Sequence, residues 1–163
     1  MRTVIGVDPG LSGGICVMED SIIKALHKMP VRPTGKKGGF EVDGTSLAHL
    51  LVDFAGRDDV LIVVEKVHAM PKQGVSSTFT FGEGCGVIRG VLETLCLPRN
   101  YITPQQWVKV VLEGTPKGDK TTRGFRVAQG LWPNAPFIPE GCRKPHMGLV
   151  DAALIAEYGR RCL

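Results

Sequence analysis

Two short apolar runs that each end on a carboxylate constrain the fold of this chain most strongly. Residues 4–7 lead into Asp8 and a tight Pro-Gly turn, and residues 60–64 lead into Glu65. Both runs are continuous rather than alternating in polarity, which is typical of strands covered on both faces and lying parallel in an α/β sheet. We therefore expect Asp8 and Glu65 to lie at the same edge of one sheet. An isolated Asp-Pro-Gly is also typical of an aspartate that only caps a turn.

The remaining pattern predicts one domain over residues 1–163, because no linker interrupts it. Before the run at 60–65, three strands are expected to form an antiparallel meander over residues 2–8, 13–19 and 21–29. A fifth, short strand is expected over residues 101–103. Apolar spacing predicts helices from a cap at Asp43 or Thr45 to Gly56, and over 75–96, 105–112, 121–131 and 146–161. The Pro- and Gly-rich segments 30–42 and 132–145 are expected to be irregular, and 30–42 mobile.

Composition excludes several classes of protein. The chain has 163 residues with 43% hydrophobic and 22% charged content, which is ordinary for a globular domain. No signal peptide is visible and no apolar stretch approaches the length of a membrane span, so we expect a cytosolic protein with no membrane partner. The five cysteines lack the C-x-x-C spacing of zinc sites and are expected to be free thiols.

Positive charge is modest in total but gathered in clusters. The formal net charge is +4, and basic residues group at 32–37, 117–126, 143–144 and 160–161. Such clusters fit a polyanionic partner, and solvated loops explain them equally well.

A third acid, Asp151, lies near the start of the last expected helix. Asp8, Glu65 and Asp151 could converge there, and converging carboxylates repel one another unless cations bind them. Hard oxygen ligands select Mg²⁺ or Mn²⁺, and two such ions can activate water for phosphodiester cleavage. Taken alone, Asp151 is also typical of a helix cap or a surface acid.

Five segments, in order along the chain, resemble the RuvC family of Holliday junction resolvases. They are the strand and turn from Val4 to Cys16, VVEKV at 63–67, FGEGCGV at 81–87, PQQWVK at 104–109 and DAALIA at 151–156. The resemblance implies a ribonuclease H-like fold, in which a five-stranded mixed sheet of three antiparallel and two parallel strands is flanked by helices. It also implies a homodimer with two Mg²⁺ or Mn²⁺ ions per active site, which makes paired nicks in four-way DNA junctions and leaves 5′-phosphate and 3′-hydroxyl ends.

The same resemblance assigns roles to individual residues. It makes Asp8, Glu65 and Asp151 metal ligands, and it places Lys109 and Lys120 near the scissile phosphate. The chain departs from the bacterial pattern at Gly148, where that family usually carries another aspartate. His146 is the nearest replacement, and it could ligate a metal, act as a general base or only hydrogen-bond at the helix start.

Further residues are expected at the DNA. The loop after Glu65 resembles the segment that inserts an apolar wedge into the junction, which would place His68 or Met70 there, with Lys72 beside them. Ordinary loop roles are equally open to these residues. Other expected DNA contacts are basic: Lys109, Lys117, Lys120 and Arg123. Trp107 and Trp132 are expected in the core rather than stacked on bases.

The sequence therefore predicts a metal-dependent nuclease for branched DNA. Its small size and the histidine near its C-terminus resemble phage or organellar branches of the family, so forks and flaps are possible substrates, in the cytosol of the host cell if phage-encoded. Three alternatives remain open. They are a nuclease for structured RNA, a junction-binding protein without catalysis, and a relative of sugar kinases and actin-like ATPases, whose phosphate-binding hairpin resembles residues 4–18 but whose fold needs two such halves.

Overall fold

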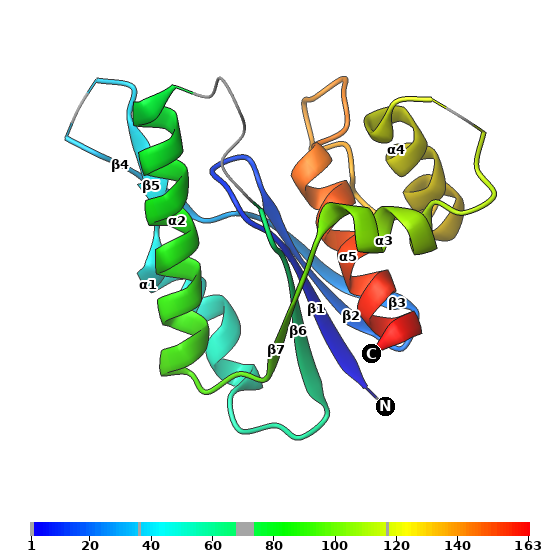
Figure 1. Cartoon of the computed structure of the whole chain (residues 1–163), viewed down its shortest axis with the longest axis horizontal. Coiled ribbons are helices and arrows are strands. Elements are labelled where there is room, and N and C mark those ends of the chain that lie inside the picture. The colour runs from blue at the N-terminus through cyan, green and yellow to red at the C-terminus, as the bar shows by residue number, and fades with distance from the viewer. Residues whose placement is uncertain (1, 36, 68–73, 117) are drawn as a thin grey trace.

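A mixed sheet forms the centre of the computed structural model, which describes residues 2–35, 37–67, 74–116 and 118–163. Its five strands run in the order β3-β2-β1-β6-β7 (Figure 1). The antiparallel half contains β1 (Thr3–Asp8), β2 (Gly14–Glu19) and β3 (Ile22–Lys28). The strands β6 (Val60–Glu65) and β7 (Arg99–Ile102) extend the sheet parallel to β1. The predicted fold class is confirmed, including the shared carboxyl edge of β1 and β6.

Helices cover both faces of the sheet, so the molecule has three layers. On one side lie α1 (Gly44–Leu51), a 3₁₀ turn (Val52–Phe54) and the long helix α2 (Val75–Thr94). The other side carries α3 (Pro104–Val111), α4 (Lys120–Leu131) and α5 (Met147–Cys162), as Figure 1 shows. Each side encloses its own apolar core, which explains why residues 4–7 of β1 and 60–64 of β6 carry no polar side chain on either face of the sheet.

Helix starts are set by local caps. The Asp43 side chain accepts hydrogen bonds from two backbone N–H groups of α1, and Thr103 forms a reciprocal capping box with Gln106 at α3. Asp119 caps α4 by accepting from the Thr122 N–H, so Lys120 becomes the first residue of that helix. The helices therefore begin within one residue of where the sequence predicts them.

The sequence predicts an irregular connection over residues 30–42, and this prediction of irregular structure is wrong for part of the segment. Here β4 (Val31–Pro33) pairs with β5 (Phe40–Val42) in a small antiparallel hairpin. A 2.7 Å ion pair between Arg32 and Glu41 links the two strands. Val42 is buried against α2, where its side chain would meet a Cβ at Gly84. Tertiary packing therefore orders a segment whose composition is that of a loop.

Close backbone packing seats α5 on the sheet. A Cβ atom at Gly6 would overlap the Ala152 carbonyl oxygen, and a Cβ atom at Gly14 would lie 2.5 Å from the Gly148 carbonyl oxygen. Only glycine allows two backbones to approach this closely. The N-terminal half of α5, which carries Asp151, therefore lies directly on β1 and on the turn that follows it.

None of the helices in the described ranges is long and apolar enough to cross a bilayer.

Candidate active site

Three carboxylates meet at the carboxyl edge of the sheet. Asp8 ends β1, Glu65 ends the neighbouring β6, and Asp151 comes from the first turns of α5. Burial, followed by the negative charges of Asp151 and Glu65, raises the pKa of Asp8 to about 8. Burial also raises the pKa of Asp151, although Lys120 opposes that shift. The sequence prediction that these acids converge agrees with this geometry, and their mutual repulsion favours the binding of cations.

Lys120 is the cation that the protein itself supplies to this cluster. Its Nζ donates to Asp151 Oδ2 at 2.9 Å and lies 3.9 Å from Glu65 Oε1. The lysine reaches the site because the Asp119 cap fixes it at the start of α4. Of the two lysines assigned to the scissile phosphate, Lys120 is therefore at the acids.

Lys109 lies elsewhere on the surface. It is exposed on α3 two residues after the buried Trp107, hence on nearly the opposite side of that helix. No ion pair or hydrogen bond joins Lys109 to the three acids among the residues with described positions.

Trp107 completes the cluster from α3. Its side chain is fully buried, as the sequence predicted, and its indole Nε1 donates to Glu65 Oε1 at 2.7 Å. Lys120 Nζ lies 4.5 Å from the centre of the indole ring. Sequence reasoning placed Trp107 in the core and missed these contacts. The signal that could have found them is that a buried tryptophan requires an acceptor for its N–H group.

His146 occupies the N-cap position of α5. Its backbone N–H donates to the Phe137 carbonyl, while its ring Nδ1 is buried and has no hydrogen-bond partner among the described residues. Burial, followed by the charge of Lys28, lowers the pKa of His146. The ring is therefore neutral near pH 7 and its charged neighbour is Lys28 rather than an acid.

The departure at Gly148 has a steric reason. A Cβ atom there would overlap the Ser12 carbonyl oxygen and lie 2.7 Å from the Gly13 Cα. The turn after β1 thus fills the space in which a side chain at this position would have to begin. An aspartate at position 148 is incompatible with this packing of α5.

The donor set at this edge fits a hard divalent cation. All three side chains offer carboxylate oxygens, which suit Mg²⁺ or Mn²⁺ better than Zn²⁺. Within the described part of the chain, no three His, Cys, Asp or Glu side chains are already arranged at metal-binding distances. The Lys120 ammonium lies between Glu65 and Asp151 and neutralises them in this arrangement. A cation that used Asp151 Oδ2 as a ligand would compete with the Lys120 ammonium for that oxygen.

The other expected DNA contacts have separate environments. Arg123 is half-buried and donates to Thr115 Oγ1 and the Leu112 carbonyl, so it holds the segment between α3 and α4. The remaining expected contacts lie outside the described residues: His68, Met70, Lys72 and Lys117.

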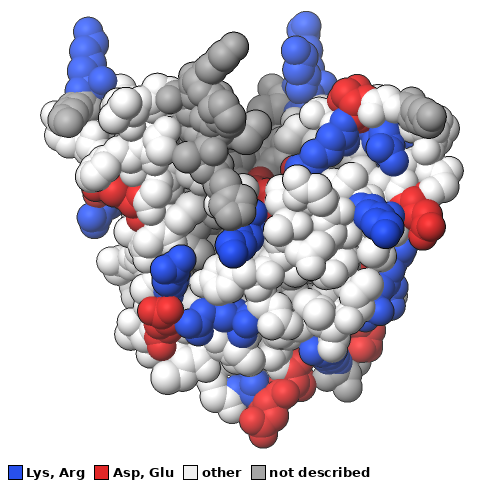
Figure 2. Space-filling model, viewed as in Figure 1, with Lys and Arg blue, Asp and Glu red and all other residues white. Residues whose placement is uncertain are grey.

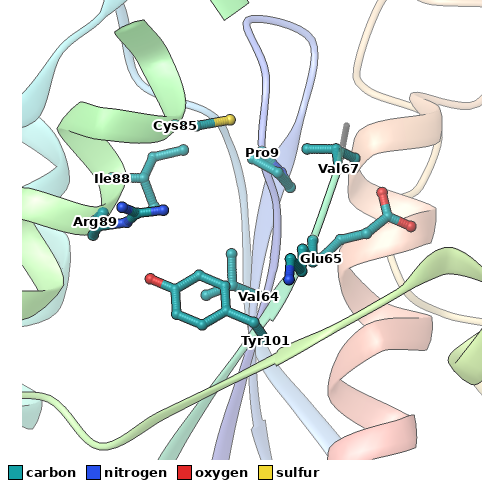
Figure 3. Close-up of a pocket in the computed structure, with 9 residues that line it drawn as sticks. Pro9, Val64, Glu65, Val67, Cys85, Ile88, Arg89 and Tyr101 are labelled. Carbon is teal, nitrogen blue, oxygen red and sulfur yellow. The ribbon is translucent and has the colours of Figure 1, made fainter. Parts of the chain in front are cut away.

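A small pocket lies on the α2 side of the same strand end. Figure 3 shows it between Arg89 of α2 and Tyr101 of β7, with the Glu65 carboxylate pointing away from it. Figure 2 shows a hollow in this face of the molecule, with a few acidic atoms visible inside it and Lys or Arg side chains on part of its edge. Basic side chains beside such a hollow suit a polyanionic ligand.

No protein-family model and no curated protein sequence matches the chain. Solved structures do. Thermus thermophilus RuvC in complex with a Holliday junction substrate aligns with a TM-score of 0.61 and 16% identity, over 99% of this chain and 96% of that one. A second Thermus thermophilus RuvC structure aligns with a TM-score of 0.56 and 17% identity, over 96% of this chain and 92% of that one. The yeast mitochondrial Holliday junction resolvase Ydc2 aligns with a TM-score of 0.56 and 15% identity, over 98% of this chain and 78% of that one. The chain therefore has the ribonuclease H-like fold of the RuvC resolvases, as its sequence motifs predicted.

Proposed function

We propose that this protein is a RuvC-family endonuclease that cuts four-way DNA junctions and depends on divalent metal ions. One observation carries the proposal: Asp8, Glu65 and Asp151 meet at one sheet edge, and repulsion among them contributes to the raised pKa of Asp8. The fold shared with junction resolvases, and the Lys and Arg side chains beside the hollow in Figure 2, support DNA as the substrate. Such a protein would act in the cytosol.

The three carboxylates would hold two Mg²⁺ or Mn²⁺ ions. When bound, such ions activate water and stabilise the leaving oxygen of an in-line displacement, leaving 5′-phosphate and 3′-hydroxyl ends. Asp8 and Glu65 are fixed by adjacent strands and Asp151 by α5, so the chain's own packing sets their spacing. Lys120, once released from Asp151, would neutralise charge on the scissile phosphate.

His146 and the exposed basic residues have secondary roles in the proposal. The neutral ring of His146, with its unsatisfied Nδ1, can accept a proton or ligate a metal. Lys109 would contact DNA from the exposed side of α3, and Arg123 would support the loop before α4. The wedge role of His68 or Met70 and the DNA contacts of Lys72 and Lys117 remain part of the same proposal.

A homodimer is also proposed, because α2 leaves one face uncovered. Val75 and Phe79 are 88% and 67% exposed, and a Cβ atom at Gly82, Gly86 or Gly90 would meet nothing within 4 Å. These residues recur at helical spacing, so they form a flat apolar stripe that a second copy of α2 can approach closely. Two copies would present two active sites to a junction that is itself two-fold symmetric.

The proposal is tested by cleavage of immobile and mobile four-way DNA junctions with Mg²⁺, Mn²⁺ or EDTA. Linear duplex, fork, flap and an RNA junction serve as competing substrates. We expect symmetric nicks that require metal and fall by at least about 10³-fold in Asp8→Asn, because a metal ligand is lost. Asp53→Asn is the matched control, since Asp53 is an exposed acid on the opposite side of the sheet.

Each other outcome points to a named alternative. Junction binding without nicking at any metal concentration would identify a binding protein whose site is inactive. Equal cutting of forks and flaps would broaden the substrate class, and a preference for the RNA junction would replace DNA by structured RNA. His146→Ala and His146→Asn, compared over a pH series, show whether the imidazole takes part.

A further inference from the structure

We propose that Trp107 is the positioning residue of this active site: its indole N–H fixes the Glu65 carboxylate for metal binding, while its ring face holds Lys120 beside Asp151. The inference rests on the proposed function, because it assigns a role within the same metal site. Trp107 has no need to touch the substrate. It acts through the two groups that it contacts.

The first contact restricts Glu65. This carboxylate is 6% exposed, and the fully buried Trp107 donates to its Oε1 at 2.7 Å. Indole N–H can only donate, so Glu65 Oε1 accepts this hydrogen bond, and the bond favours one orientation of the carboxylate. Among the described residues Oε2 has no hydrogen-bond partner, which leaves one oxygen of Glu65 available to a cation.

The second contact concerns the lysine that neutralises the acids. Lys120 Nζ lies 4.5 Å from the indole ring centre and 2.9 Å from Asp151 Oδ2. One side chain of α3 therefore links an acid from β6 with a lysine from α4, which in turn binds an acid from α5. A metal ion entering the cluster would displace the Lys120 ammonium from Asp151 but leave the hydrogen bond between Trp107 and Glu65 in place.

The chain offers a matched control for this role. It contains two tryptophans, and Trp132 also donates its Nε1, at 2.9 Å, to the Ser21 backbone carbonyl. That contact joins the end of α4 to the turn before β3 and involves none of the three acids. Trp132→Phe therefore removes the same donor from a structural site.

The experiment compares Trp107→Phe with Trp132→Phe by calorimetric titration with Mn²⁺ and by junction cleavage over a series of Mn²⁺ concentrations. We expect the Kd for Mn²⁺ to rise about 10- to 100-fold in Trp107→Phe, as is typical when a ligand loses its supporting hydrogen bond. The Mn²⁺ concentration for half-maximal cleavage should rise by the same factor, and saturating Mn²⁺ should restore most of kcat. Trp132→Phe should leave both midpoints unchanged.

A more conservative replacement keeps the test valid if Trp107→Phe does not fold. In the Trp132→Phe background, β-(3-benzothienyl)alanine at position 107 preserves the ring shape but has sulfur in place of the N–H group. The background protein with its single remaining tryptophan should also change its fluorescence on Mn²⁺ addition, because Lys120 leaves the ring. If the replacements at position 107 lower the melting temperature but leave the Mn²⁺ midpoint unchanged, Trp107 contributes only to packing and the inference is overturned.

The proposed function and the positioning role of Trp107 can fail separately. Wild-type protein that binds no Mn²⁺ and cuts no junction would overturn the proposed function, and the positioning role with it. Wild-type protein that binds Mn²⁺ and cuts, while both replacements at position 107 match Trp132→Phe, would overturn only the positioning role.

Discussion

The two long helices on opposite faces of the sheet, α5 and α2, differ in how much of each is buried. Most of α5 is buried, and glycines at its contacts with β1 and β2 allow backbone to rest on backbone. By contrast, only Gly84, Ile88 and Leu92 of the twenty residues of α2 are buried. The monomer fixes α5, which carries Asp151, whereas much of α2 is exposed, and the proposed dimer contact depends on that exposed face. Glycines allow α5 to pack closely against the sheet within the chain, whereas several glycines of α2 lie on an exposed surface.

The largest expected effect concerns the three acids that lie together where α5 packs on the sheet. Asp8 has a pKa of about 8 in the folded protein against 3.8 as its ordinary value, mainly because it is buried and then because Asp151 and Glu65 repel it. Between these values the folded state binds the extra proton. The free energy of unfolding of metal-free protein should therefore be highest below pH 4 for this group and fall by up to about 5 kcal/mol as pH rises to 8.

Urea unfolding in EDTA across this pH range measures the effect. Asp8→Asn should flatten the slope, and Mg²⁺ should stabilise the wild type most above pH 8, where the carboxylates are ionised. A wild-type slope equal to that of Asp8→Asn would mean that the pKa of Asp8 is not raised in the folded protein.

Gly6→Ala directly tests the close packing of α5 against β1. The new Cβ would overlap the Ala152 carbonyl oxygen and lie 2.5 Å from the Ala156 nitrogen, both of them backbone atoms that cannot rotate away. We expect a loss of about 3 kcal/mol in the free energy of unfolding, together with weaker metal binding because Asp151 shifts. Thermal and chemical unfolding measure the first effect. A stable Gly6→Ala protein with normal activity would contradict this packing.

Phe79→Asp tests the open face of α2. Phe79 is 67% exposed in the monomer, so an aspartate there should hardly change the stability of a single chain. At the centre of a dimer contact it should weaken association about 10- to 100-fold, as judged by sedimentation velocity over a concentration series. Ile22→Asp is the control, since Ile22 of β3 is 63% exposed. Equal association of both variants would remove α2 from the dimer contact.

The smallest effect is expected where a helical glycine touches nothing. A Cβ atom at Gly130 in α4 would meet no atom within 4 Å, so Gly130→Ala should stabilise the protein by about 0.5–1 kcal/mol through helix propensity. The same change that disrupts Gly6 should thus have the opposite sign at Gly130. Melting temperature measures it, and a destabilised Gly130→Ala protein would show an unrecognised contact there.

Two acids of α5, the half-buried Asp151 and the buried Glu157, have pKa values shifted in opposite directions. Asp151 has a raised pKa, chiefly through burial. For Glu157 burial acts in the same direction, but hydrogen bonds from Arg160 and Arg161 outweigh it and lower the pKa. Arg160 and Arg161 stand three and four residues after Glu157, whereas Leu154 and Ile155 stand at the same spacing after Asp151. The arginine spacing can be read from the sequence once the helix is predicted, but the burial of each acid depends on how α5 packs against the sheet.

The sequence by itself determined the sheet and the positions of Asp8 and Glu65, because strand periodicity and apolar runs are local properties that the backbone follows directly. It also predicted Asp151 near a helix start, with small residues facing the sheet. The tertiary structure alone decided that Lys120 rather than Lys109 reaches the acids, that Trp107 binds Glu65, and that Gly148 has no room for a side chain. These depend on how helices distant in sequence are rotated and how closely they pack, and no local pattern encodes that geometry.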